Sequence, residues 1–195
     1  MKNSSPSSFD GVEREPLHLR KLDMRGFKRS DGLYEVEGHL QDTKSHPFIH
    51  PVPGRSVAEG DFVHDMGVRI IFDETMLVHD VQTYTLSAPY QPCKNGGEAL
   101  SAIKGLRMAG GWSREVNARL RGATSCTHLR ELLIPLATVA YQTLGFLYLQ
   151  QPDRLDANGR PKAIDSCYAY AADGDVVATR WPRFHIASET LSHDE

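Results

Sequence analysis

The spacing of apolar residues changes once along the chain, and this change limits the fold more than any other sequence feature. Up to about residue 85, apolar residues recur at every second position, which is the spacing of half-buried strands. From about residue 95 they recur at every third or fourth position, which is typical of amphipathic helices. Strands that precede helices, instead of alternating with them, indicate an α+β fold.

The first half of the chain predicts an antiparallel β-meander. Residues 33–42 alternate most clearly and form one strand, and a second pair of strands is expected at 66–72 and 76–85. The basic segment 14–29 predicts one or two edge strands, and the proline-rich stretch 45–60 predicts a long loop. In the first strand, one face carries Tyr34, Val36 and Leu40 and the other carries Glu35, Glu37, His39 and Gln41.

The second half predicts two shorter helices, a long buried helix and a late hairpin. One short helix begins near Asn95, and the other carries an apolar stripe from Trp112 to Leu120. The long helix is expected from Cys126 to Gln150, because its apolar residues lie around most of its circumference. The hairpin is expected at 166–171 and 176–181, around an Asp-Gly turn.

Length and composition favour a single domain of an ordinary soluble protein. The 195 residues predict one domain at 13–187, with a disordered lead-in at 1–12 and a frayed tail at 188–195. A net charge of −3 argues against a nucleic-acid partner, and no apolar run is long enough to span a membrane. Three widely spaced cysteines fit the reduced cytoplasm, so we expect a cytoplasmic protein, either a monomer or a homodimer.

The strongest catalytic candidate is Cys126-Thr127-His128, at the start of the long helix. A thiol in the first turn of a helix faces unpaired backbone N–H groups and the positive end of the helix dipole, which lower its pKa. Glu131 lies three residues after His128, on the same helical face, where its carboxylate can orient the imidazole. The alternative is structural: Cys126 is then a small buried hydrophobe, and His128 makes a local hydrogen bond.

The pair His64-Asp65 is the second candidate. It begins a predicted strand beside the proline-rich loop, and Arg69 shares a strand face with Asp65. A histidine, an aspartate and an arginine at one sheet edge can bind a carboxylate or phenolate, or can transfer a proton. The alternative is a solvated strand face with an ion pair.

A row of ionisable residues on one strand, Glu35, Glu37 and His39, is the third candidate. The row is either an exposed polar face or the floor of a polar pocket. No metal and no cofactor are expected, because CxxC, HExxH and closely spaced histidine pairs are absent. On a helix, Cys126 and His128 also point about 200° apart, which does not favour a shared metal ion.

Six stretches of the chain form a recognisable series: RSDGLYEVEGHLQDTK, HDMGVRIIFD, APYQPC, GLRMAGGW, CTHLRELL and DSCYAYAADGDVVATRWPRF. By these stretches, and by their order, the chain resembles the bacterial domain-of-unknown-function family 2889 over about residues 14–185. Two positions depart from the family pattern: Ser125 replaces a glycine, and Gly67 replaces a larger residue, often tryptophan, which suggests a reshaped pocket near His64. The resemblance implies that the protein comes from bacteria that degrade aromatic compounds. It also implies a cofactor-independent carbon–carbon lyase, which releases formaldehyde from lignin-derived dimers.

The first functional hypothesis is therefore a cofactor-independent acid/base enzyme, a formaldehyde-releasing lyase acting on a small lignin-derived aromatic substrate. Its site would lie between the sheet and the long helix, with His64 or His128 as the base. Asp65 or Glu131 would orient the base, and Arg69 would hold an anionic group of the substrate. The expected substrate-binding residues are Arg69, Tyr34, Glu37, His39, Tyr90 and Trp112.

Two other hypotheses remain open at this point. In the first, the protein is a non-catalytic ligand-binding or assembly protein, and its polar clusters are structural ion pairs. In the second, it is a thiol enzyme that depends on Cys126.

Overall fold

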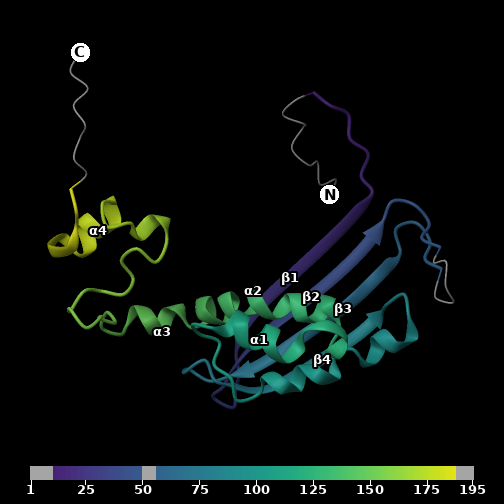
Figure 1. Ribbon diagram of the computed structural model, residues 1–195, viewed down its shortest axis with the longest axis horizontal. Coiled ribbons are helices and arrows are strands. Elements are labelled where there is room, and N and C mark those ends of the chain that lie inside the picture. Colours follow the sequence, from purple (N-terminus) through teal and green to yellow (C-terminus); the bar gives the residue numbers. More distant parts are fainter. Residues whose placement is uncertain (1–10, 50–55, 188–195) are drawn as a thin grey trace. The chain divides into compact units, whose positions relative to one another are not determined.

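The fold of the N-terminal part is a four-stranded antiparallel sheet with helices on one face (Figure 1). A computed structural model describes residues 11–49 and 56–187. The strands are β1 (His18–Lys28), β2 (Tyr34–Lys44), β3 (Phe62–Phe72) and β4 (Val78–Ser87), and they lie in the order β1-β2-β3-β4. Each strand pairs antiparallel with its sequence neighbour, so the sheet is a simple meander.

Two α-helices, α1 (Trp112–Leu120) and α2 (Thr127–Thr143), lie over one face of this sheet (Figure 1). α2 contacts β1, β2 and β3, and α1 packs against α2. The short 3-10 helices η1 (Gln91–Asn95) and η2 (Glu98–Ile103) lie between β4 and α1 in the chain, and η3 (Gly122–Thr124) lies between α1 and α2. The remaining elements are α3 (Gly145–Leu149), η4 (Tyr168–Tyr170), α4 (Asp175–Arg180) and η5 (Pro182–Phe184).

The core lies between the sheet and α2, because alternate residues of the strands face the helix. On β2 these are Tyr34, Val36 and Leu40, all buried, as the period-two pattern predicts. Gly38 is in the same phase, and a Cβ atom there would lie 3.2 Å from Leu136 of α2, so helix and strand are close at this point. The face of the sheet that carries these residues is called the helix face below, and the opposite one the open face.

The predicted α+β class and the β-meander are confirmed. The long helix is shorter than expected, because α2 ends at Thr143 and α3 follows. The late hairpin is wrong, since the region forms η4 and α4 instead. The β-branched pair Val176-Val177 favours a strand in the sequence. In the structure Val177 and Trp181 are both buried, and their spacing of four residues places them on one helical face.

The chain divides into two compact units, Met1–Gly145 and Phe146–Glu195. The second unit has its own small core, formed by Ile164, Ala172, Val177 and Trp181. The single domain expected at 13–187 stays a prediction. The lead-in expected at 1–12 falls largely outside the described residues, and the tail at 188–195 falls wholly outside them. In the described part of the chain, no helix has the length and apolar character needed to cross a membrane.

Candidate functional site

A row of polar side chains crosses three strands on the helix face of the sheet. Arg20 of β1 is the register partner of Asp42 of β2, which is in turn the register partner of His64 of β3. Arg20 donates two hydrogen bonds of 2.8 Å to Asp42, Nε to Oδ1 and Nη2 to Oδ2. His64 lies with Nδ1 3.0 Å from Oδ2, and Nε2 of His18 lies 3.0 Å from Oδ1. Asp42 is thus a buried carboxylate with four nitrogen partners.

The N-terminus of α2 brings a second histidine and a thiol to this row. His128, in the first turn of α2, places its ring against that of His64, with the ring centroids 3.9 Å apart. Cys126 is the N-cap residue of α2, and its Sγ lies 3.9 Å from Nδ1 of His128. The backbone N–H of Cys126 donates a 2.7 Å hydrogen bond to the carbonyl of Gly96, which fixes the start of α2 beside η1.

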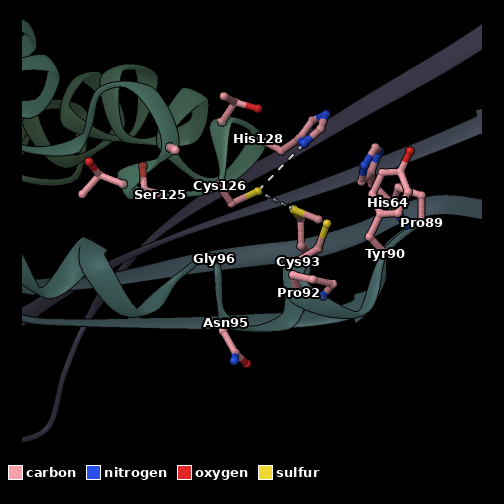
Figure 2. Close-up of a pocket in the computed structure, with 14 residues that line it drawn as sticks. His64, Pro89, Tyr90, Pro92, Cys93, Asn95, Gly96, Ser125, Cys126 and His128 are labelled. Atoms are coloured by element: carbon pink, nitrogen blue, oxygen red, sulfur yellow. Dashed lines mark hydrogen bonds between the residues drawn. The ribbon is translucent and has the colours of Figure 1, made fainter. Parts of the chain in front are cut away.

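These side chains line a cavity of about 630 Å³ (Figure 2). This volume lies within the usual range for small-molecule sites, roughly 300 to 1,000 Å³. His64, Cys126 and His128 supply the ionisable groups, while Tyr90 and Met66 add apolar surface. The other described lining residues are Pro89, Pro92, Cys93, Asn95, Gly96, Ala123, Thr124, Ser125 and Thr127. A small organic ligand would therefore contact two imidazoles and a thiol at once.

The electrostatics set the protonation states of the site. Burial opposes ionisation of Asp42, but hydrogen bonds and charge from Arg20, with further hydrogen bonds from His64 and His18, lower its pKa to about 2. Asp42 is therefore ionised at neutral pH and can only accept hydrogen bonds, so the proton on His64 lies on Nδ1. Burial lowers the pKa of His64, and the neighbouring charge of His128 lowers it further. His64 is thus a neutral imidazole whose Nε2 can accept a proton.

The thiol of Cys126 is also perturbed. Burial alone would raise its pKa, but hydrogen bonds from His128 and from the backbone N–H groups of Leu129 and His128 lower it overall. This is the effect that the sequence predicts for a thiol at a helix N-terminus, although Cys126 is the cap of the helix and not a member of its first turn.

A metal ion would be held by Asp42, His64 and His128, whose ligand atoms all lie within 4.8 Å of one another. A carboxylate has about four acceptor sites. Because Asp42 already has four nitrogen partners, a metal ion would have to displace one of them. The rings of His64 and His128 also pack against each other, with their planes tilted by 36°, whereas the ligands of one ion point their nitrogen atoms toward it. The geometry suits proton transfer better than metal binding.

Asp65 and Arg69 lie on the open face of the sheet, away from the cavity. Successive strand residues point to opposite faces, so Asp65 cannot orient its neighbour His64. It lies 2.6 Å from Nε2 of His39 instead, and His39 is therefore also on the open face. Arg69 is held there by Glu37, with Nε 2.8 Å from the carboxylate. The open face thus has its own polar network, which includes four of the residues predicted for the site.

Three further predicted residues lie elsewhere. Tyr34 is at the opposite end of β2 from Asp42 and packs on Phe72, with ring centroids 5.9 Å apart. Trp112 is buried between α1 and α2, where its Nε1 donates a 2.9 Å hydrogen bond to the carbonyl of Leu133. Glu131 pairs with Arg20 rather than with His128, at 2.8 Å.

Glycine at position 67 does not enlarge the cavity. A Cβ atom there would lie 2.4 Å from the ring of Tyr84, its register partner on the open face. Of the predicted site residues, the structure thus brings together His64, Cys126, His128 and Tyr90.

The resemblance points to Asp42 among other positions, but sequence reasoning assigned no role in the site to Asp42 or Arg20, although the alternation contained a signal. Asp42 continues the phase of Val36 and Leu40, so it is a charged residue at a position where the pattern demands an apolar one. A carboxylate on a buried face needs partners, because unpaired burial of a charge is costly. Its presence predicts a functional or structural cluster at that end of the sheet.

The model of one protein family, described as a protein of unknown function (DUF2889), matches residues 18–142. The match covers more than half of the chain and includes the four strands, α1 and nearly all of α2. No curated protein and no solved structure matches the chain significantly.

Proposed function

The chain belongs to the DUF2889 family, whose description assigns no activity, and we propose that it is a cofactor-independent acid/base enzyme acting on a small aromatic molecule. The observation that carries the proposal is the pair of adjacent imidazoles in the cavity, one of them hydrogen-bonded to a buried carboxylate. A histidine oriented by an aspartate is a common general base.

The two imidazoles divide the roles of base and acid. Because burial lowers its pKa, His64 is the neutral imidazole and serves as the base. We assign the role of the acid to His128, because its ring lies against that of His64, with centroids 3.9 Å apart, and lines the same cavity.

The reaction we propose is the cleavage of a carbon–carbon bond with release of formaldehyde. His64 takes the proton of a hydroxymethyl group, and the O–H electrons form the C=O bond of formaldehyde. The electrons of the broken C–C bond form a C=C bond with the next carbon, which expels its oxygen substituent. His128 gives a proton to that oxygen, so the products are formaldehyde, an alkene, and water or an alcohol. The proton gained by His64 replaces the one lost by His128.

The cavity supports a substrate of one or two aromatic rings. Its volume suits a molecule of that size, and Tyr90, Met66, Pro89 and Pro92 provide apolar surface against which a ring can lie. The proposal that the substrate is derived from lignin rests on the family resemblance. A cytoplasmic location and a homodimer are further parts of the proposal.

The test is formaldehyde release from a 1,2-diarylpropane-1,3-diol by the purified protein. We expect His64→Gln to lower turnover by about two to four powers of ten without unfolding the protein. His39→Gln is the matched control, because it removes a histidine–aspartate pair that lies on the open face, away from the cavity. Full activity in His64→Gln, or an equal loss in His39→Gln, would contradict the proposed base. Binding of the diol without any product would favour the non-catalytic hypothesis.

A thiol enzyme is the second candidate function, and the observation in its favour is the lowered pKa of Cys126 beside His128. Here Cys126 would attack the substrate as a thiolate, with His128 as its partner. Cys126→Ala and Cys93→Ala separate the two candidates, since both thiols line the cavity. An acid/base enzyme keeps most of its activity in both variants, whereas a thiol enzyme loses it in Cys126→Ala alone.

A further inference from the structure

Arg20 connects three elements around the proposed base. From β1 it binds both carboxylate oxygens of Asp42 on β2, and its Nη1 donates a 2.8 Å hydrogen bond to Glu131 of α2. The guanidinium group is a rigid planar fork, and two parallel hydrogen bonds to one carboxylate fix the orientation of both groups. Asp42 is therefore held in place before it meets His64.

The hydrogen bonds of Asp42 leave one geometry for His64. Oδ1 accepts from Nε of Arg20 and from His18, and Oδ2 accepts from Nη2 of Arg20 and from Nδ1 of His64. These four donors fill the acceptor sites of the carboxylate. His64 can reach Asp42 only through the one remaining position on Oδ2, so its ring orientation and its tautomer are both set.

Arg20 also balances the charge of Asp42. A lone carboxylate beside an imidazole favours imidazolium, and a protonated His64 cannot act as a base. With the guanidinium bound, the Asp42–Arg20 pair is neutral overall, and Asp42 can accept a hydrogen bond from His64 without drawing a proton onto it. His64 contacts Asp42 of β2 and the ring of His128 of α2, and Arg20 and His18 of β1 bind the same carboxylate of Asp42. Cys93, Cys126 and Tyr90 line the same cavity as His64, and Glu131 of α2 pairs with Arg20.

We propose that Arg20 is a positioning residue, which acts through Asp42 to hold His64 as a neutral imidazole with its proton on Nδ1. The inference rests on the proposed role of His64 as the base, but its main readout needs no substrate. Without Arg20, the carboxylate of Asp42 beside His64 loses its guanidinium partner, so the protonated histidine should become harder to deprotonate.

The experiment is an NMR titration of the imidazole ¹⁵N signals in the full-length protein. In the wild type we expect His64 as the Nδ1–H tautomer. In Arg20→Gln we expect its midpoint to rise by about one pH unit or more, with a mixture of tautomers. Arg20→Lys, which restores the charge but not the fork, should return the midpoint toward the wild-type value while the tautomers stay mixed. Arg69→Gln is the matched control, since it removes an arginine paired with a carboxylate on the open face.

An unchanged midpoint and a single tautomer in Arg20→Gln would overturn the inference, as would an equal shift in Arg69→Gln. If Arg20→Gln does not fold, Arg20→Lys decides, because mixed tautomers support the inference and a single tautomer overturns it. The acid limb of the pH–rate profile should move upward with the His64 midpoint. A shifted midpoint in a protein that shows no lyase activity would leave the positioning role in place and remove the proposed reaction, so the two failures are distinguishable.

Discussion

At the scale of single residues, the site depends on which face of a strand each side chain occupies. His64 and Asp65 are adjacent in sequence, yet one faces the cavity and the other faces away. The period-two pattern contains this information, because His64 is in phase with the buried Met66 and Val68. The pattern does not show which residues of a neighbouring strand lie opposite His64. Asp42 lies beside His64 because of the sheet register, so the two could not be paired from the sequence.

The low pKa of Asp42 predicts a loss of stability in acid. Its pKa is about 2 when folded and near 3.8 when unfolded, so the carboxylate stabilises the fold above the unfolded value. This contribution, about 2 kcal/mol, is lost as the pH falls from about 5 toward 1. Urea unfolding at pH 7 and at pH 3 should show a smaller difference in Asp42→Asn than in the wild type. The other carboxylates affect both proteins alike, so an equal difference in both would contradict the prediction.

A second prediction at the residue scale concerns metal ions. Since Arg20 and the histidines occupy Asp42, proton transfer by His64 and His128 needs no ion at the cavity. Prolonged dialysis against a strong chelator should leave formaldehyde release within about twofold of the untreated protein, a change too small for loss of a catalytic ion. Loss of activity that is restored by one added divalent metal would show that Asp42 exchanges a nitrogen partner for the ion.

At the scale of elements, the sequence predicts the type of most elements better than their ends. The strands and α1 are found where the patterns place them, because alternation and helical stripes reflect burial directly. The apolar run after Cys126 continues beyond Thr143, yet the helix ends there. Gly145, which follows the C-cap residue Leu144, is a helix-stop signal that the continuing apolar pattern outweighed in the prediction. The late hairpin failed for a different reason: two valines and an Asp-Gly pair suit either a hairpin or a helix start, and local packing decides between them.

The start of α2 is held against η1 by close packing, and this predicts the effect of one methyl group. Gly96 has φ −63° and ψ −9°, a conformation that alanine adopts easily. A Cβ atom there, however, would lie 2.7 Å from Cβ of Cys126. Gly96→Ala should therefore cost about 1 to 3 kcal/mol and displace the thiol and His128. Gly110→Ala is the control, because nothing lies within 4 Å of its Cβ position.

The measurement is thermal unfolding combined with the rate at which Cys126 reacts with iodoacetamide. Gly96→Ala should lower the melting temperature and change the alkylation rate, while Gly110→Ala should change neither appreciably. Wild-type behaviour of Gly96→Ala in both measurements would mean that the start of α2 moves freely with respect to η1.

At the scale of the whole molecule, the proposed site belongs to one of the two compact units. The strands, η1 and α2 that supply its residues all lie within Met1–Gly145, and the family match ends at residue 142. Composition and length favoured one domain, because the chain shows no linker of unusual composition at residue 145. The division follows from which residues contact one another in the structure, and the periodicity of the sequence does not show these contacts.

This division predicts that a chain ending at Gly145 folds by itself and keeps the site. The described residues of its core, between the sheet and α2, lie within the unit, whereas the described part of Phe146–Glu195 has a buried cluster of four residues. The shortened protein should unfold cooperatively, and its His64 should show the tautomer and titration midpoint of the full chain. The complementary piece of about 50 residues should be largely unfolded alone, because so small a domain buries little apolar surface. An unfolded 1–145 chain would instead show that the second unit completes the core, and the site would then depend on both units.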